Sequence, residues 1–366
     1  MLGLYIHIPF CNSICSYCDF TKRLGNNNLY SEYMDKLIEE IDAYKNYLDK
    51  VDTVFIGGGT PNVIPLELLE KLFIKIAPAL NHSIESTIEL NPELITDDLC
   101  KLLYKYKFNR ISIGVETIND NSIKLLNRHH TKNDIIQAFN LLRNNNLTNI
   151  NCDLIFGIPY TTINDVKNDL EFILSLKPTH ISYYDLIIEN KTILKHKIDI
   201  GEIEVLDEDL EADMYDYINE KLEDNNYHHY EISNYAKDGF ESMHNMIYWN
   251  VDNYIGVGMG ASGYLNDIRY DNNTNINAYF KAFTKNTSKI SIEMKKKEFM
   301  MLGLRLVDGI STTRYKNLFN SDPFSDFDLE KLIKKGLIEV KDDYIRIPKD
   351  KLFIANIIWS EFVWKR

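Results

Sequence analysis

The feature that most constrains this chain is a repeated pattern of short β-branched runs, each followed by a Gly, Pro or Asn stop and a helical stretch. The six runs are Leu4–Ile8, Thr53–Ile56, Ser86–Leu90, Arg110–Val115, Asn149–Phe156 and His180–Ile188. Helical periodicity follows at Tyr30–Tyr47, Leu66–Leu80, Thr96–Tyr106, Lys132–Asn144, Ile163–Leu176 and Asp207–Asn225. Crossovers of this length connect parallel strands, so the alternation predicts an α/β fold with a parallel sheet.

Six such units form either a doubly wound open sheet or an incomplete parallel barrel, and both place the chemistry at the carboxyl ends of the strands. The unusual residues of the chain gather at these ends. Three cysteines follow the first run, Gly57–Pro61 the second, Glu89–Pro92 the third and Glu116 the fourth, while Asp153–Pro159 ends the fifth. One edge of the sheet is therefore predicted to carry the functional site.

The pattern changes at about residue 227, which predicts two domains, 1–226 and 227–366. Residues 227 to about 285 are rich in Tyr, Asn and Gly. From about residue 293 we expect three helices, Glu293–Val307, Thr312–Phe319 and Asp326–Lys335, and a hairpin of Leu337–Val340 with Tyr344–Ile347. This smaller α+β domain thus has a winged-helix-like end. Its balance of acidic and basic residues favours a structural or docking role over DNA binding.

Charge and cysteine usage exclude several classes of protein. The 366 residues carry 41 basic and 54 acidic side chains, a net charge of −13, which argues against non-specific binding to nucleic acid. Five cysteines in a chain of this length do not form a disulfide scaffold. The first residues lack a signal-peptide pattern, and no run approaches the roughly 18 apolar residues of a membrane span. A cytoplasmic location is expected.

Three of the cysteines form the most specific motif, Cys11-Asn-Ser-Ile-Cys15-Ser-Tyr-Cys18. The spacing lets three thiolates of one loop converge on a small volume. A structural zinc site wants four ligands, which here means recruiting His7 or Asp19. A [4Fe–4S] cluster bound by three thiolates leaves one iron open to an outside ligand. Spacing favours the cluster, with the zinc site and unliganded thiols as alternatives.

A glycine-rich segment, Gly57-Gly-Gly-Thr-Pro61, ends the second run. Its backbone can approach a ligand because no Cβ intervenes, although a tight turn explains the same residues. It is not a GxGxxG or Walker sequence, so a nicotinamide or P-loop site is disfavoured. Glu89, Glu116, Arg128 and Asp153 stand at or just after strand ends, where a surface or helix-capping role is the alternative to ligand binding.

Together these residues resemble the radical S-adenosylmethionine (SAM) enzymes, and more narrowly the oxygen-independent coproporphyrinogen III oxidase-like family. The matching segments are Tyr5–Cys18, Gly57–Pro61, Asn109–Val115, Asn151–Pro159, Tyr230–Ala236 and His244–Trp249. The resemblance covers nearly the whole chain and implies an incomplete parallel (β/α)6 barrel. The true coproporphyrinogen dehydrogenases carry a fourth cysteine where this chain has Phe20. Cys-x-Phe and His-Asn-x-x-Tyr-Trp are typical of the HemW-type haem chaperone branch, which the chain resembles.

The resemblance implies roles for individual residues. Cys11, Cys15 and Cys18 would bind three irons of a [4Fe–4S] cluster and leave the fourth to the amino and carboxylate groups of SAM. The implied SAM-binding set is Tyr5, Tyr17, Gly58, Gly59, Thr60, Glu89, Glu116, Arg128 and Asp153. Glu116 departs from the family, which usually has Gln there, and a carboxylate cannot donate hydrogen bonds as an amide does. Reductive cleavage of SAM is the chemistry expected of such a site.

His244 is the haem ligand that the resemblance implies. Histidine is the commonest proximal haem ligand, and Tyr248 and Trp249 could pack on a porphyrin. The alternative is a turn in which His244 and Asn245 satisfy backbone groups while Trp249 fills the core. The residues alone favour the turn. With the resemblance taken into account, the turn and the haem ligand are equally supported interpretations of His244.

Three functional hypotheses follow. The first is a haem chaperone that binds haem, one [4Fe–4S] cluster and SAM, and passes haem to acceptor apoproteins; respiratory membrane proteins are a candidate class, and the cluster needs an electron donor. The second is oxygen-independent coproporphyrinogen III dehydrogenase, an oxidative decarboxylation in porphyrin biosynthesis. The third is a zinc-bound structural protein with a DNA-docking winged helix. Without the fourth cysteine the status of the chain as an enzyme stays open, and no catalytic residue is assigned.

Overall fold

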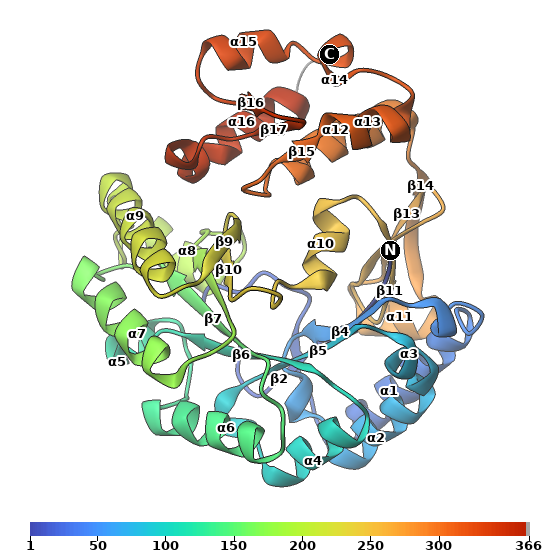
Figure 1. Cartoon of the computed structure of the whole chain (residues 1–366). Helices are drawn as coiled ribbons and strands as arrows, with labels where there is room; N and C mark the ends of the chain where they lie inside the picture. The colour runs from blue at the N-terminus through green and yellow to red at the C-terminus, as the bar shows by residue number, and fades with distance from the viewer. Residues whose placement is uncertain (364–366) are drawn as a thin grey trace.

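The protein folds around one large sheet, and the computed structural model describes residues 1–363. Twelve strands form that sheet in the order β14-β13-β12-β11-β1-β4-β5-β6-β7-β8-β10-β9 (Figure 1). Its centre consists of six parallel strands: β1 (Leu2–Ile8), β4 (Thr53–Gly58), β5 (Glu85–Leu90), β6 (Arg110–Glu116), β7 (Ile150–Phe156) and β8 (His180–Asp185). The predicted α/β fold with a parallel sheet is confirmed.

Helices connect the parallel strands, and most of them lie in an arc along one side of the sheet (Figure 1). They are α1 (Asn27–Asp42), α2 (Leu66–Lys75), α3 (Ala77–His82), α4 (Asp97–Lys105), α5 (Asp120–Leu125), α6 (Lys132–Asn144), α7 (Ile163–Leu176), α8 (Ile193–Asp199) and α9 (Glu208–Asp224). Short 3-10 helices occupy Leu48–Lys50, Pro61–Val63 and Pro92–Leu94. The bounds of α6 and α7 agree with the prediction because a capping box starts each one, at Thr131 and Thr162.

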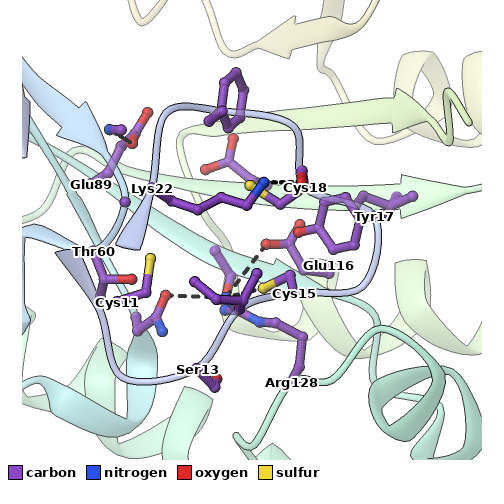
Figure 2. A pocket seen from close by; sticks show the side chains of 18 of the residues that line it. Cys11, Ser13, Cys15, Tyr17, Cys18, Lys22, Thr60, Glu89, Glu116 and Arg128 are labelled. Carbon is purple, nitrogen blue, oxygen red and sulfur yellow. Dashed lines mark hydrogen bonds and ion pairs between the residues drawn. The ribbon is translucent and has the colours of Figure 1, made fainter. Parts of the chain in front are cut away.

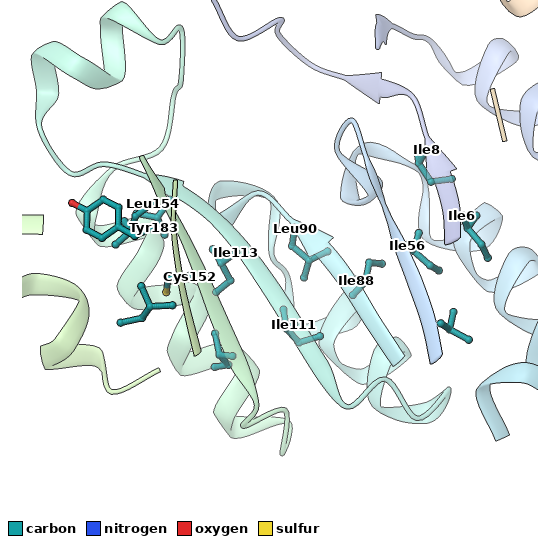
Figure 3. Close-up of a cluster of buried hydrophobic side chains, with 14 of the residues drawn as sticks. Ile6, Ile8, Ile56, Ile88, Leu90, Ile111, Ile113, Cys152, Leu154 and Tyr183 are labelled. Atoms are coloured by element: carbon teal, nitrogen blue, oxygen red, sulfur yellow. The ribbon is translucent and has the colours of Figure 1, made fainter. Parts of the chain in front are cut away.

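Residues alternate between two faces along each parallel strand. One face is apolar and packs under the helices; Ile6, Ile56, Ile88, Ile111 and Leu154 are among its fully buried members (Figure 3). The other face is unusually polar, since parallel strands are commonly apolar on both faces. We call it the polar face and define it by seven residues: Glu89, Arg110, Ser112, Asn151, Asp153, His180 and Ser182.

The sheet continues beyond the proposed domain boundary at residue 226. β9 (His228–Glu231) and β10 (Asn234–Ala236) extend it next to β8, and β11 (Asn253–Val257) pairs parallel with β1. The far end consists of β12 (Ser262–Leu265), β13 (Ile268–Asn272) and β14 (Thr284–Lys289), with α11 (Ile276–Lys281) before the last strand. α10 (Met243–Trp249) packs against β1 and β4. The division at 226 stays a prediction about folding units, because both sides share one sheet.

The remaining residues form a helical unit with a small sheet of order β15-β17-β16. Its elements are α12 (Ile292–Gly303), β15 (Ile310–Ser311), α13 (Thr312–Phe319), α14 (Pro323–Asp326), α15 (Leu329–Lys334), β16 (Glu339–Lys341), β17 (Tyr344–Arg346), a 3-10 helix at Lys349–Ile354, and α16 (Ala355–Val363). The helices and hairpin follow the predicted order, and α10 lies between this unit and the parallel strands (Figure 1). None of the helices in residues 1–363 has the length and apolar character needed to cross a membrane.

Candidate functional site

A cavity of about 440 Å³ opens at the carboxyl ends of the parallel strands. Eleven of the residues singled out in the sequence line it: Cys11, Cys15, Tyr17, Cys18, Gly58, Gly59, Thr60, Glu89, Glu116, Arg128 and Asp153. Tyr5 and His244 are not among the lining residues. Residues at the ends of five strands, β1, β4, β5, β6 and β7, therefore meet at one place, as the parallel topology predicts.

The cysteine loop runs between two short paired strands, β2 (Phe10–Cys11) and β3 (Arg23–Leu24), and its side chains surround the cavity (Figure 2). Ser16 anchors the middle of the loop to the end of α5. Its amide donates to the Leu126 carbonyl over 3.0 Å, and its hydroxyl donates to the Leu125 carbonyl over 2.7 Å. These two hydrogen bonds fix the middle of the cysteine loop to the end of α5.

The three thiols lie in a partly buried place with two nearby cations. Burial raises the pKa of Cys11 and Cys15, and it raises the pKa of Cys18 to about 11. Lys22 and Arg128 oppose this shift: the Lys22 ammonium donates to the Cys18 carbonyl, and Arg128 Nη1 lies 4.0 Å from Cys15 Sγ. Thiolates here need further positive charge, which bound metal supplies.

The donor set fits an iron–sulfur cluster better than a single zinc ion. In the part of the chain that the structure describes, no group of three or more His, Cys, Asp or Glu side chains is placed to hold one metal ion. A zinc ion needs such a group, because its ligands converge on one point. A cluster is bound at separate irons, so three thiols spread around one cavity suit it.

The glycine segment after β4 is packed too tightly for side chains. A Cβ on Gly57 would lie 2.5 Å from a Glu89 carboxylate oxygen, and a Cβ on Gly59 would lie 2.6 Å from the Phe10 carbonyl oxygen. Gly58 has a φ of +113°, which L side chains rarely adopt. These glycines bring the backbone against the cysteine loop and the Glu89 carboxylate.

The amides of this segment are already engaged. Gly58 donates to the Glu89 carboxylate over 2.9 Å, while Gly59 and Thr60 each donate to a carbonyl of the preceding chain over 2.7 Å. A ligand that meets this backbone would therefore meet carbonyl oxygens, which accept from an amino group.

Among the acidic residues that line the cavity are the three singled out in the sequence, Glu89, Glu116 and Asp153, and the first two have strongly raised pKa values. Burial raises the pKa of Glu89 and that of Glu116 to about 7, and the nearby Asp153 adds to both shifts. The Arg128 guanidinium, 3.9 Å from Glu116, and the Tyr17 hydroxyl act against the shift of Glu116. Glu116 also has a φ of +60°, a strained conformation that is typical of functional sites. The cavity suits a ligand with positive charge or hydrogen-bond donors.

Arg128 connects this group to neighbouring strand ends. Its guanidinium donates to the Gly114 carbonyl and, over 3.2 Å, to Asn91 Oδ1. Its Nε atom is buried and has no hydrogen-bond partner. The guanidinium is therefore oriented by protein contacts and keeps unused donor capacity at the cavity.

Tyr5 supports the site from outside the cavity. Its hydroxyl lies 2.8 Å from His7 Nδ1, and His7 Nε2 lies 2.7 Å from the Thr21 carbonyl oxygen. The carbonyl only accepts, so Nε2 donates and Nδ1 accepts from Tyr5. Burial lowers the pKa of His7 to about 4, which keeps the ring neutral. With both nitrogens engaged, His7 is not free to complete a zinc site in this arrangement.

His244 lies at the opposite, amino end of the strands and is 1% exposed. Its Nδ1 is 2.7 Å from Thr53 Oγ1, its Nε2 is 2.9 Å from Tyr248 Oη, and its ring stacks on Phe55 with centroids 5.1 Å apart. Burial lowers its pKa to about 3. The segment is a helix and not the turn that the alternative interpretation expects. In this arrangement His244 has no free nitrogen for a haem iron.

Sequence reasoning missed the side chains that hold Asp153. Ser112 Oγ donates to Asp153 Oδ2 over 2.7 Å, and Asn151 Nδ2 lies 2.9 Å from Asp153 Oδ1. The signal was present in Asn151-x-Asp153, because residues two apart on a strand share a face. Lys22 and Asn91 were also missed, and nothing in their local sequence distinguishes them.

Comparisons with known proteins agree with this arrangement. Residues 5–173 match the radical SAM superfamily, and residues 295–350 match the HemN C-terminal domain. The heme chaperone HemW of Lactococcus lactis is 40% identical over 98% of this chain and 96% of its own. The heme chaperone HemW of Bacillus subtilis is 34% identical over 99% of both chains. The structure of coproporphyrinogen III oxidase (HemN) from Escherichia coli, a radical SAM enzyme, has a TM-score of 0.83 over 99% of this chain and 89% of its own at 20% identity, which shows a shared fold.

Proposed function

The chain belongs to the HemW family of radical SAM proteins, and from this premise we propose that it is a haem chaperone that binds haem and delivers it to acceptor proteins. Membership of the radical SAM superfamily implies a [4Fe–4S] cluster and SAM. The observation in this chain that carries the proposal is the loop of three thiols facing the same cavity as the carboxylates of Glu89, Glu116 and Asp153 and the guanidinium of Arg128. Respiratory membrane proteins as acceptors, and an electron donor for the cluster, belong to the same proposal.

In this proposal the cavity residues divide the work of holding cluster and SAM. Cys11, Cys15 and Cys18 bind three irons, while Lys22 and Arg128 offset the negative charge of the thiolates. When bound, the cluster supplies an electron for the reductive cleavage of SAM. The protein contributes position and the exclusion of water from the site.

The remaining residues orient SAM. The carboxylates of Glu89, Glu116 and Asp153 accept from its amino and hydroxyl groups, and the carbonyls of the Gly58–Thr60 backbone accept from its amino group. The guanidinium of Arg128 attracts its carboxylate, and Tyr17 covers one side of the cavity. Tyr5 does not line the cavity, so its proposed role is to support the site through its hydrogen bond to His7, which in turn bonds to the Thr21 carbonyl.

No observation favours the dehydrogenase. Phe20 stands where that enzyme has its fourth cysteine, and its side chain is 65% exposed at the rim of the cavity. An apolar ring at this position provides no ligand for metal. The structural likeness to HemN, at 20% identity, concerns the fold alone.

We place haem ligation by His244 in a second conformation, in which α10 has separated from β1 and β4. In the present arrangement Thr53 and Tyr248 occupy both ring nitrogens. Iron coordination needs a free nitrogen, so at least one of these hydrogen bonds has to open first. Separation of α10 from β4 would open the bond to Thr53, whereas Tyr248 lies on α10 with His244 and has to turn away separately.

The test is anaerobic reconstitution followed by haem titration, read from visible absorption. We expect a saturable haem band in the wild type, a weaker band in His244→Ala, and an unchanged band in His82→Ala, which alters an exposed histidine of α3. Absence of a saturable band from the wild type would overturn the chaperone proposal. An intact cluster that cleaves SAM and forms protoporphyrinogen IX without binding haem would establish the dehydrogenase instead.

A further inference from the structure

We propose that Asn151, with His180 and Tyr230 behind it, is a positioning residue that sets the orientation of the Asp153 carboxylate in the cavity. These side chains form one row of hydrogen bonds across the polar face. Of the four, only Asp153 lines the cavity. The inference rests on the proposed cofactor site in one respect, that Asp153 meets the ligand there.

The row begins at the carboxylate, where two donors meet it. Asn151 Nδ2 lies 2.9 Å from Asp153 Oδ1, and Ser112 Oγ donates to Asp153 Oδ2 over 2.7 Å. Asn151 Nδ2 also donates to Ser112 Oγ over 2.7 Å, which directs the hydroxyl proton of Ser112 toward the carboxylate. Asn151 and Ser112 are 1% and 3% exposed, so water does not compete for these bonds. Each carboxylate oxygen keeps acceptor capacity for a ligand in the cavity.

The other end of the amide is clamped as well. Asn151 Oδ1 lies 2.6 Å from His180 Nδ1 and accepts from the Ser182 hydroxyl over 3.2 Å. His180 Nε2 lies 2.8 Å from Tyr230 Oη, which accepts from the Ser242 amide over 3.1 Å. The row therefore ends on a backbone amide just before α10.

The direction of the hydrogen bonds follows from the Asp153 carboxylate, which accepts from Asn151 Nδ2. Asn151 Oδ1 then faces His180 Nδ1 and accepts its proton. A neutral histidine with its proton on Nδ1 accepts at Nε2 from the Tyr230 hydroxyl, whose oxygen also accepts from the Ser242 amide. Burial and the nearby Arg110 guanidinium lower the pKa of His180, so the ring stays neutral.

The opposite orientation of the amide is disfavoured at both ends. It would point Asn151 Oδ1 at the Asp153 carboxylate and Nδ2 at the proton on His180 Nδ1. An acceptor would then face an acceptor at Asp153, and a donor would face a donor at His180. Both places are buried, where unmade hydrogen bonds are costly. One arrangement remains, in which the Asp153 carboxyl group is held as an acceptor for hydroxyl or amino groups of the ligand.

The strand register explains why these residues meet. Ser112 pairs with Asn151, and Asn151 pairs with His180, on three adjacent parallel strands. Asn151 and Asp153 are two residues apart on β7 and so share a face. Tyr230 arrives from β9, beyond the parallel strands.

The first experiment measures SAM affinity by equilibrium dialysis with the full chain carrying its reconstituted cluster. Asn151→Asp keeps the shape but cannot donate, and we expect a loss of affinity of at least about tenfold. Tyr230→Phe removes only the hydroxyl, and we expect a loss of roughly threefold. The matched control is Tyr227→Phe, whose buried hydroxyl donates to the Pro178 carbonyl over 2.6 Å and leaves the row intact; its affinity should equal that of the wild type.

The second experiment reads the tautomer of His180 directly, by 15N NMR of the histidine-labelled chain without cluster or SAM. We expect the Nδ1–H form in the wild type and a shift toward the Nε2–H form in Tyr230→Phe, which a merely structural hydroxyl would not cause. An Nε2–H form in the wild type would overturn the proposal, and so would Asn151→Asp binding SAM within about twofold of the wild type. If Asn151→Asp does not fold, the tautomer and Tyr230→Phe decide. If the wild type binds no SAM, the cofactor site is wrong while the tautomer still tests the row.

Discussion

The two ends of the parallel strands carry similar polar residues but differ in how those residues are partnered. At the carboxyl end, burial raises the pKa of Glu89 and of Glu116 to about 7, and Arg128 Nε has no partner. At the amino end, His244 has both ring nitrogens bonded, and Glu85 accepts from two amides at the start of α10 over 2.9 Å each. One end presents a cavity, and α10 covers the other.

This difference shows that residue type alone does not mark a functional site. A histidine, a glutamate and a threonine at the amino end form a closed set of hydrogen bonds, which stabilises the packing of α10. The carboxylates of Glu89 and Glu116 at the carboxyl end have few protein partners and keep acceptor capacity that a ligand can use. Unmet charge and hydrogen-bonding capacity around a cavity are therefore the stronger signal of function.

The largest effect that would test this comparison is removal of one thiol at the carboxyl end. Cys15→Ser should reduce iron from about four atoms per chain to near zero after anaerobic reconstitution, because two thiolates do not retain a cluster. Iron and acid-labile sulfide analysis measure the change. Cys100→Ala is the control, since Cys100 is buried in α4 away from the loop and should keep full iron. Equal iron in both variants would contradict the proposed ligand set.

A substitution at the amino end should change the free energy of unfolding instead of cluster or SAM binding. His244→Ala removes the stacking on Phe55 and leaves Thr53 and Tyr248 without a partner, so we expect a loss of about 3 kcal/mol in the free energy of unfolding. Urea unfolding of the chain without cluster measures it. SAM affinity should stay near the wild-type value, because His244 does not line the cavity.

The exposed His82 provides the control for that substitution. His82→Ala should change the free energy of unfolding by less than about 0.5 kcal/mol, as exposed substitutions usually do. If both alanine variants cost the same, α10 does not close the amino end in solution. The comparison between the two ends would then lose its basis.

Glu89 should make the carboxyl end less stable as pH rises. Its folded pKa of about 7 lies above the ordinary value of 4.5, so the folded chain binds more protons than the unfolded chain between these pH values. Stability therefore falls from pH 4.5 to 7 and levels off above pH 7. Glu89→Gln should remove the contribution of Glu89 to that decline and leave that of Glu116, with a gain of about 3 kcal/mol at pH 8 and little change at pH 4.5.

Urea unfolding of the chain without cluster at both pH values measures this difference. Glu67→Gln on the exposed side of α2 is the control and should show the same pH dependence as the wild type. A Glu89→Gln variant that is no more stable at pH 8 would mean that Glu89 is already compensated, as the residues at the amino end are.

Local sequence signals were enough to predict the parallel strands and several helices. α6 and α7 have the predicted bounds because apolar periodicity and a capping threonine lie within the same segment. The pairing of β11 with β1 was not predictable, because it joins segments about 250 residues apart through backbone hydrogen bonds that no local pattern encodes. The predicted helix Asp326–Lys335 corresponds to α15, which begins only at Leu329 because Asp328 caps it, and α14 was not predicted.

The candidate site also contains some residues that local sequence predicts and others that it does not. Cys11, Cys15 and Cys18 were predictable because their chemistry depends on short spacing within one loop. The Asn151–Asp153 contact could have been derived from strand alternation, but its continuation to His180 and Tyr230 needs the register of three strands. Whether the ring nitrogens of His244 are free could not be predicted, because it depends on hydrogen bonds to Thr53 and Tyr248, and only the fold brings Thr53 close to His244.

The smallest expected effect concerns whether the amino end can open for haem. Tyr248→Phe frees His244 Nε2 from the hydroxyl 2.9 Å away and keeps the ring that packs beside it. If haem iron binds His244 after α10 moves, losing this competing hydrogen bond, worth about 1 kcal/mol, should tighten haem binding by roughly fivefold in an absorption titration. Tyr254→Phe on β11, whose ring also contacts Tyr248, is the control and should leave the affinity unchanged. Equal haem affinity in wild type and Tyr248→Phe would place the haem ligand elsewhere and leave the amino end a closed core.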